Sequence, residues 1–441
     1  MLSIDIDAER LISALLALAE TEQVCILDSC GVGHLGSHLM IAGIRPTDVI
    51  ELTTSGDDVL NELDIRFAAP CKAGFFTLSY DLGRKLLNVG TDYHGNEPDL
   101  FYASFDCLVV HDYSSGETFL TGNSNIFATV EELLRNARFE ERTIGPNQNV
   151  RSSFTQNEYI AAVRSIQESI RNGNTYQTNL TQKLTIELRS EIRPEDIFVS
   201  LRRDHPAPFA ALFKRKASTV VSTSPERFYN VSNRNGLRRI TASPIKGTRR
   251  RGKDPAEDER LRGELIGSEK DRAENTMIVD LLRNDLGRVC EYGSVVVEKL
   301  CDIEEHPTLF HLVSTVSGDL RDDSKPSDIL RALFPCGSIT GAPKIRTMQI
   351  IDQIEPDKRG LSMGAIGYHI PESGFEGLEP GIDTSVAIRT IVFRDGIATF
   401  NVGGGIVIDS EPAGEYEESL LKAKALLSAM GISELSAEIG V

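Results

Sequence analysis

One lysine of the chain stands on a constrained turn, between Pro-Ile and Gly-Thr in the run from Thr241 to Thr248. Lys246 is followed closely by further cations, namely Arg249, Arg250, Arg251 and Lys253. A lysine that is partly desolvated or placed beside other cations gives up its proton more easily and could act as a nucleophile. The same residues would also suit a basic surface loop, so two interpretations of Lys246 stay open.

A glutamate that could act as a general acid follows an expected strand. Glu226 belongs to the run from Ser224 to Phe228, just after a strand predicted to end at Val221. If its carboxyl group is buried, its pKa rises and it can donate a proton near neutral pH. If it pairs instead with its neighbour Arg227, it is a structural residue, and the sequence leaves both interpretations open.

Two pairs of carboxylates occur at helical spacing. Asp271 and Glu274 share a face of one predicted helix, and Glu415 and Glu418 share a face of another with Lys422. Carboxylates from two helices could meet around Mg²⁺, which takes one or two of them directly and keeps several waters. Solvated helix faces with ordinary ion pairs show the same spacing. Spacing alone therefore does not establish a metal site.

Small residues and two further polar side chains complete the candidates. The run from Pro335 to Lys344 and the triplet Gly403-Gly404-Gly405 could bring backbone N–H groups to an anion, but neither fits a nucleotide-binding fingerprint. Arg389, expected in a strand over 385–390, could grip a carboxylate through two parallel hydrogen bonds. His311 lies on a β-patterned run, where it is either catalytic or a satisfied core residue.

The elements that must position these residues follow from hydrophobic periodicity. Helices are expected over 8–20, 129–138, 159–170, 270–282, 344–354 and 412–430. Strands are expected over 24–27, 75–80, 104–110, 180–188, 218–221, 294–297, 309–316, 386–393 and 397–402. Because strands and helices do not alternate, the pattern favours an α+β fold with antiparallel sheets over a Rossmann or barrel array.

Charge and composition exclude several classes of protein. The 441 residues include 47 basic and 65 acidic side chains, a net charge of −18, which argues against nucleic acid and against a polybasic membrane contact. No apolar stretch reaches the length that spans a bilayer. The 7 cysteines are odd in number and form no CxxC pair, as expected for free thiols in a reducing compartment. We expect a cytoplasmic enzyme.

A polar stretch from Asn136 to Phe154 is the clearest candidate boundary between two regions of the chain. It predicts an N-terminal region over 1–150 and a catalytic region over 151–441, which we expect to pack as one globular unit.

Eight segments, in order along the chain, resemble the chorismate-utilising enzymes. This family includes component I of anthranilate synthase and of aminodeoxychorismate synthase, isochorismate synthase and salicylate synthase. The matching segments are 224–228, 244–248, 274–287, 338–344, 364–368, 387–390, 403–405 and 415–418. The resemblance implies an α+β fold of two packed, largely antiparallel sheets with helices outside.

Within the family, the resemblance favours the aminodeoxychorismate synthase branch, which supplies 4-aminobenzoate for folate. Lys246 stands where anthranilate synthases have alanine, and Glu274-Asn275 stands where they usually have Glu-His. Gln177 stands where water-using relatives carry a lysine base, and an amide cannot activate water. Anthranilate synthase component I is the alternative, and a binding protein that has lost catalysis is a third hypothesis.

The resemblance also implies the site. Mg²⁺ would be held by Glu274 and Glu415 directly, and by Asp271 and Glu418 through water. Glu226 would protonate the departing C4 hydroxyl of chorismate while Lys246 adds at C2, and ammonia would then add at C4 and expel the lysine from C2. His311 takes the position of the family's active-site histidine. The residues expected to surround the substrate are Arg389, Thr340, Tyr368, Gly403, Gly404, Lys422 and Gln177.

Two further expectations concern ligands beyond the reaction itself. The chain shows no glutaminase cysteine elbow, so we expect a separate glutamine amidotransferase subunit to supply ammonia. Family members have an amino-acid pocket, and a tryptophan pocket would here be formed by Asp28, Ser29, Pro208 and Phe209.

Overall fold

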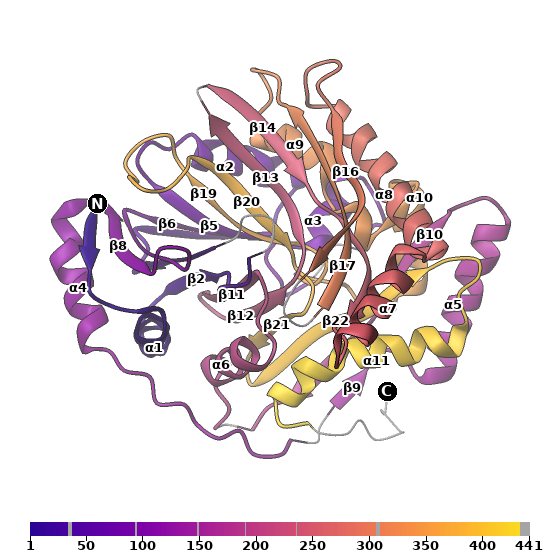
Figure 1. Cartoon of the computed structure of the whole chain (residues 1–441), viewed down its shortest axis with the longest axis horizontal. Coiled ribbons are helices and arrows are strands. Elements are labelled where there is room, and N and C mark those ends of the chain that lie inside the picture. Colours follow the sequence, from indigo (N-terminus) through magenta and orange to yellow (C-terminus); the bar gives the residue numbers. More distant parts are fainter. Residues whose placement is uncertain are drawn as a thin grey trace.

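The computed structural model describes residues 1–33, 38–92, 95–147, 150–189, 191–234, 236–305 and 309–432. These residues form two large sheets with helices packed against their outer faces (Figure 1). The strands pair antiparallel throughout both sheets, as between β10 and β22 or β19 and β20. The expected α+β fold of two packed, largely antiparallel sheets is therefore confirmed.

The first sheet has 12 strands within the described residues, in the order β1-β8-β7-β3-β2-β11-β12-β21-β22-β10-β18, with β9 paired to β10. Its strands are β1 (Leu2–Ile4), β2 (Val24–Asp28), β3 (Leu39–Ile44), β7 (Cys107–Asp112), β8 (Glu117–Gly122), β9 (Val150–Ser152), β10 (Gln177–Glu187), β11 (Phe209–Lys214), β12 (Thr219–Ser224), β18 (Gly341–Ala342), β21 (Thr390–Arg394) and β22 (Ile397–Ile406).

The second sheet has 10 strands in the same described ranges, in the order β15-β17-β14-β13-β20-β19-β5-β6-β4, with β16 paired to β17. Its strands are β4 (Asp48–Leu52), β5 (Ala73–Leu78), β6 (Leu100–Phe105), β13 (Arg227–Arg234), β14 (Leu237–Ala242), β15 (Ile245–Arg250), β16 (Val296–Glu305), β17 (Leu309–Asp319), β19 (Ala365–Ile370) and β20 (Gly381–Val386).

The α-helices are α1 (Ala8–Ala19), α2 (Gly56–Phe67), α3 (Tyr80–Leu86), α4 (Phe127–Asn136), α5 (Gln156–Arg171), α6 (Pro194–Asp204), α7 (Pro255–Ile266), α8 (Glu269–Gly287), α9 (Pro326–Leu333), α10 (Lys344–Ile354) and α11 (Pro412–Ala429). Two short 3₁₀ helices span Ser124–Ile126 and Gly337–Ile339. In the described part of the chain, no helix is long and apolar enough to cross a bilayer.

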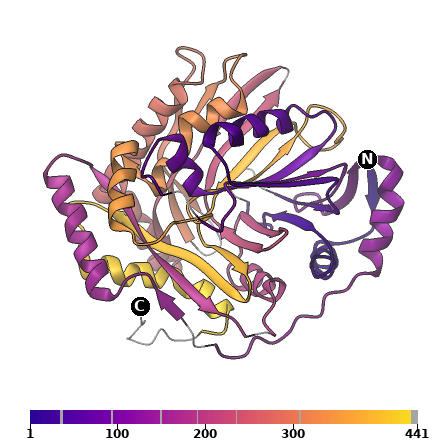
Figure 2. The ribbon, with the colours of Figure 1, turned by 180° about the vertical axis from the view of Figure 1, so that it is seen from behind.

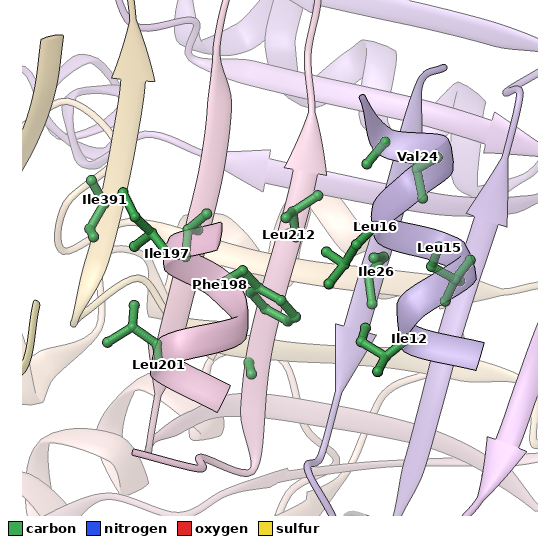
Figure 3. Close-up of a cluster of buried hydrophobic side chains, with 14 of the residues drawn as sticks. Ile12, Leu15, Leu16, Val24, Ile26, Ile197, Phe198, Leu201, Leu212 and Ile391 are labelled. Carbon is green, nitrogen blue, oxygen red and sulfur yellow. The ribbon is translucent and has the colours of Figure 1, made fainter. Parts of the chain in front are cut away.

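Two helices cover one face of the first sheet with a shared apolar cluster (Figure 3). Helix α1 begins at Asp7, whose side chain accepts a hydrogen bond from the backbone N–H of Arg10. Apolar residues at helical spacing then face the sheet. The labelled members of the cluster are Ile12, Leu15 and Leu16 of α1, Ile197, Phe198 and Leu201 of α6, and Val24, Ile26, Leu212 and Ile391 of the strands.

Two expected strands are each divided, and in both cases the chain changes sheet at the break. The run 104–110 becomes β6 in the second sheet and β7 in the first, separated by Asp106. The run 386–393 is divided between β20 in the second sheet and β21 in the first, because Arg389 adopts a left-handed φ of 50°. The predictions of single strands were wrong. Both halves of each run are apolar, so hydrophobic periodicity alone does not reveal that the chain passes from one sheet to the other.

The two sheets are built from both ends of the chain. In the first sheet β2 lies beside β11, and in the second β5 lies beside β19. Residues 137–147 contain no helix or strand and run along the lower edge of the molecule from α4 (Figures 1 and 2).

Candidate active site

Glu226 lies where the chain crosses from the first sheet to the second, between β12 and β13. The crossing is fixed because the backbone N–H of Val386 donates to the Glu226 carbonyl at 3.0 Å. The side chain is 6% exposed, and its Oε1 atom has no hydrogen-bond partner among the described residues. Burial raises the pKa of Glu226, while the nearby Lys246 ammonium opposes that rise. Such a carboxyl group can remain protonated and act as an acid.

The neighbouring arginine does not pair with Glu226. Arg227 instead forms a two-pronged ion pair with Asp383, with its Nε and Nη2 atoms at 2.9 and 2.8 Å from the carboxylate oxygens. The interpretation of Glu226 as the partner of Arg227 is therefore wrong.

Lys246 lies near the start of β15, and its Nζ atom donates to the Ser338 carbonyl at 3.3 Å. No carboxylate forms an ion pair with it in the described part of the chain. The next residue, Gly247, has a φ of 83°, and a Cβ atom there would lie 2.9 Å from the carboxyl carbon of Asp271. Glycine thus lets β15 approach α8 closely. Lys246 is therefore held near the acid without being neutralised by a salt bridge.

The three arginines after Lys246 each have an acidic partner. Arg249 pairs with Asp271 at 3.2 Å, and Arg251 pairs with Asp258 at 2.6 Å. Arg250 pairs with Glu257. These cations therefore do not form the unbalanced positive cluster that their sequence spacing suggests.

Two of the four candidate metal carboxylates, Glu274 and Glu415, form no ion pair with another described residue. Burial raises the pKa of Glu274, the nearby ammonium groups of Lys246 and Lys270 oppose this rise, and the charges of Asp271 and Glu415 add to it. Burial likewise raises the pKa of Glu415, although the Ser410 hydroxyl donates to its Oε1 at 2.6 Å. Two desolvated carboxylates that lie close together repel each other when both are ionised, and a cation bound between them would offset that repulsion.

The other two carboxylates are already paired. Asp271 binds Arg249, and Glu418 binds Lys422 at 2.8 Å. Although burial opposes it, the Lys422 ammonium lowers the pKa of Glu418. Within the described ranges no three His, Cys, Asp or Glu side chains converge as a ready metal cluster. The donor set fits Mg²⁺ with Glu274 and Glu415 as direct ligands and the rest of its shell filled by water.

Arg389 follows the end of β20, and its carbonyl accepts from the backbone N–H of Thr223, three residues before Glu226. Its side chain is exposed to solvent, yet the surrounding protein desolvates it enough to lower its pKa. The guanidinium has no hydrogen-bond or ion-pair partner among the described residues. An accessible but desolvated guanidinium without a counter-charge is suited to bind an anion.

The three glycines of β22 lie in close packing, which leaves no room for a side chain at Gly403 or Gly405 and little room at Gly404. A Cβ atom on Gly403 would lie 1.8 Å from the Leu180 carbonyl oxygen, and one on Gly405 would lie 2.0 Å from Nε2 of Gln177. On Gly404 it would lie 3.2 Å from Oε2 of Glu415. The strand backbone thus lies directly between Gln177 and the α11 carboxylate, and Lys422 donates to the Gly403 carbonyl at 3.0 Å.

Two further candidates lie on neighbouring segments. The Nδ1 atom of His311 is 2.9 Å from the Thr248 hydroxyl, so its ring lies against the strand that carries Lys246. Thr340 is fully buried, and its hydroxyl donates to the Cys336 carbonyl at 3.0 Å. That proton is therefore already used within the 336–343 segment in this structure.

A cavity of about 480 Å³ lies elsewhere, lined by strands of both sheets. Its wall contains the four residues expected to form an amino-acid pocket, Asp28, Ser29, Pro208 and Phe209. Tyr368 lines this cavity as well, although the sequence analysis placed it with the substrate residues. We refer to it as the Asp28 cavity.

Two charged side chains in the wall of the Asp28 cavity, Asp28 and Arg227, already form ion pairs. Arg202 donates to Asp28 at 2.8 Å, and Tyr113 donates to the same carboxylate at 2.8 Å. The Arg227 guanidinium, paired with Asp383, lies 5.2 Å from the centre of the Phe209 ring. The Ser29 hydroxyl is buried without a hydrogen-bond partner in the described part of the chain.

Sequence reasoning did not single out two residues that hold the site together. Ser338 accepts from Lys246 and lies beside Glu226, and its place in the 338–344 segment could have indicated this. Arg359 donates to the Ile339 and Asn179 carbonyls at 3.0 and 2.7 Å. Nothing in the sequence around Arg359 distinguishes it from a surface arginine.

Comparisons with known proteins agree with this geometry. A model of the family described as chorismate binding enzyme matches residues 22–428. Aminodeoxychorismate synthase component 1 of Escherichia coli K12 is 36% identical over 395 residues, covering 85% of this chain and 83% of that protein. Anthranilate synthase component 1 3 of Haloarcula marismortui is 37% identical over 383 residues, covering 82% and 73%. The solved anthranilate synthase component I of Streptococcus pneumoniae superposes with a TM-score of 0.76 at 27% identity, covering 89% and 93%.

Proposed function

The chain belongs to the chorismate-binding enzyme family and is an enzyme, and we propose that it is component I of an aminodeoxychorismate synthase. It would convert chorismate and ammonia into 4-amino-4-deoxychorismate, for 4-aminobenzoate and folate synthesis. The observation that carries this proposal is the lysine cluster, which consists of Lys246, Glu226, Ser338 and Glu274. In it, an amine with no salt-bridge partner in the described ranges lies near a buried carboxyl group with a raised pKa.

The two groups divide the chemistry between them. The neutral amine of Lys246 forms a bond to C2 of chorismate while the C4–O bond breaks. Glu226 gives its proton to the departing oxygen, so the leaving group is water. Ammonia then forms a bond to C4 while the bond between C2 and the lysine nitrogen breaks, so its electron pair returns to the amine, and the new C4 ammonium gives a proton back to Glu226. An alanine in place of Lys246 would leave no amine for the first step.

Binding of a dianionic substrate to an acidic protein needs local positive charge. Arg389 would bind the enolpyruvyl carboxylate, with the backbone around Gly403 and Gly404 completing that contact. Glu274 and Glu415 would hold Mg²⁺, with Asp271 and Glu418 acting through water, and the ion supplies charge that polarises the ring carboxylate. The absence of a partner for Arg389 among the described residues and the raised pKa values of Glu274 and Glu415 support this assignment.

Ammonia would come from a separate glutamine amidotransferase subunit, with ammonium as its substitute in vitro. The names of the bacterial relatives as component 1 support a two-component enzyme. The Asp28 cavity would bind an aromatic amino acid such as tryptophan, supported by its volume and by the unpartnered Ser29 hydroxyl in its wall.

Product analysis tests the proposal against the alternative, anthranilate synthase component I. The similarity to the Haloarcula relative supports that alternative. The purified chain is incubated with chorismate, Mg²⁺ and ammonium, and the products are separated by chromatography. We expect 4-amino-4-deoxychorismate, and the same product from glutamine once a glutaminase subunit is added. Anthranilate as the main product would reject the proposed branch of the family.

A further inference from the structure

Arg359 belongs neither to the lysine cluster nor to the β22 glycines. Its guanidinium group nevertheless forms hydrogen bonds with the segments that adjoin both. Arg359 stands between α10 and β19 and is 3% exposed. Its Nε and Nη2 atoms bind the two carboxylate oxygens of Glu355 at 2.8 and 2.7 Å. Its remaining bonds go to backbone carbonyls, and its guanidinium carbon lies 4.5 Å from the centre of the Tyr80 ring.

One of these carbonyls belongs to the segment that touches Lys246. Nη1 of Arg359 donates to the Ile339 carbonyl at 3.0 Å. Ile339 lies between Ser338, whose carbonyl accepts from Lys246 at 3.3 Å, and the buried Thr340. A shift of the Ile339 carbonyl would therefore move the acceptor that holds the lysine.

The other contacts belong to the strand that pairs with the β22 glycines. Nη2 donates to the Asn179 carbonyl at 2.7 Å, and Asn179 lies opposite Gly405. Through Oε1, Glu355 also accepts from the backbone N–H and hydroxyl of Thr181, at 2.7 and 3.0 Å, and Thr181 lies opposite Gly403. The ion pair therefore holds two points of β10, two residues apart.

We propose that Arg359, together with Glu355, is a positioning residue that fixes the distance between the lysine cluster and the β22 backbone. The inference rests on the proposed function, because those two regions are where we place bond formation and carboxylate binding. A planar guanidinium can reach both carbonyls and the carboxylate at once, whereas a lysine ammonium offers a single point of attachment. Since a misplacement of 1 Å can cost about 10²-fold in rate, Arg359→Lys should lower kcat/KM for chorismate by about that factor.

A matched control separates positioning from general stability. Arg215 is equally buried and pairs with Glu97, with its Nη1 and Nη2 atoms at 2.5 and 3.1 Å from the carboxylate, outside the proposed site. Arg215→Lys should lower the melting temperature while leaving kcat/KM per folded protein within about threefold of the wild type. Both variants are assayed with chorismate, Mg²⁺ and ammonium, and the folded fraction is measured by circular dichroism.

A double variant keeps the test informative if Arg359→Lys folds poorly. In Arg359→Met/Glu355→Leu, neither charge is left buried without its partner, so the melting temperature should recover relative to Arg359→Met. We expect kcat/KM to stay low although stability returns. Recovery of both, or an Arg359→Lys variant that behaves like Arg215→Lys, would overturn the inference. An inactive wild-type enzyme would instead reject the proposed function itself.

Discussion

The lysine cluster and the Asp28 cavity differ in whether their charged side chains form ion pairs. In the lysine cluster, Glu226 and Glu274 are desolvated and have no ion-pair partner among the described residues. In the Asp28 cavity, the Asp28 carboxylate is bound by Arg202 at 2.8 Å, and Arg227 is bound by Asp383. Both regions lie where elements of the two sheets meet, so the difference is not one of fold.

The difference indicates what each region has to bind. A buried charge without a partner costs several kcal/mol, so such charges are retained where a ligand supplies the opposite charge. The lysine cluster therefore suits a charged substrate and a cation. In the Asp28 cavity, Asp28 and Arg227 are already paired before any ligand arrives, which suits a ligand without net charge, such as an amino acid.

The largest effect should come from removing the proposed nucleophile. Lys246→Ala should lower amination of chorismate by at least about 10³-fold, because no other amine in the cluster can take its place. Steady-state product formation with ammonium measures this. The melting temperature should change little, since Lys246 is only partly buried. An unchanged rate would show that Lys246 is not a nucleophile.

The next effect concerns the acid. Glu226→Gln should slow the reaction by about 10² to 10⁴-fold, because an amide cannot give a proton to the leaving oxygen. In the wild type, kcat/KM should fall as pH rises through the raised pKa of Glu226, since the protonated form is the active one. The variant should lack that limb of the profile.

The free energy of unfolding of the wild type should also fall as pH rises through the pKa of Glu226. The burial of Glu226 raises its pKa in the folded state, so its stabilising contribution is complete below the pKa of an ordinary glutamate and is lost as pH rises through the raised value. Glu226→Gln should remove this loss. Glu195→Gln is the control, since Glu195 is equally buried but paired with Lys214 at 3.0 Å, and its loss should reduce stability without slowing the reaction. An identical pH profile in the wild type and Glu226→Gln would contradict the assignment.

Metal binding should have a smaller effect, seen without any assay of activity. At 100 times its Kd, Mg²⁺ should stabilise the wild type by about 2.7 kcal/mol. Because Glu274 and Glu415 must ionise to bind it, and burial raises the pKa of each, the rise in melting temperature should be larger at pH 8 than at pH 5. Glu274→Gln should abolish most of the rise. Glu417→Gln, an exposed neighbour on α11, should preserve it, and equal behaviour of the two variants would argue against this site.

The smallest effect belongs to the Asp28 cavity. Tryptophan should raise the melting temperature of the wild type, and Ser29→Ala should reduce that stabilisation by about 0.5 to 1.5 kcal/mol. Without tryptophan the same variant should be as stable as the wild type, because the hydroxyl it removes is already unpartnered. Glu226→Gln should leave the response to tryptophan intact. No shift with tryptophan in the wild type would remove the contrast between the two regions.

The residues proposed to do chemistry were easier to predict from the sequence than the residues that hold them in place. Lys246 and Glu226 stand in short segments whose residue types already limit their chemistry, so sequence alone identified both as candidates. The break before Arg389 was not predicted, because a chain that moves from one sheet to the other keeps its apolar pattern. Arg359 was missed for a related reason, since its partners are backbone carbonyls of Asn179 and Ile339, and carbonyls leave no signal in a sequence.

The most direct test of the account is the mass of the protein after it meets chorismate without ammonia. The wild type is mixed with chorismate and Mg²⁺, quenched in acid and analysed by intact-mass and peptide mass spectrometry. We predict a fraction that is heavier by one chorismate less one water, with the added mass on the peptide that contains Lys246 and absent from Lys246→Ala. A Lys246 peptide that stays unmodified, in an enzyme that forms 4-amino-4-deoxychorismate when ammonium is added, would contradict attack by this lysine.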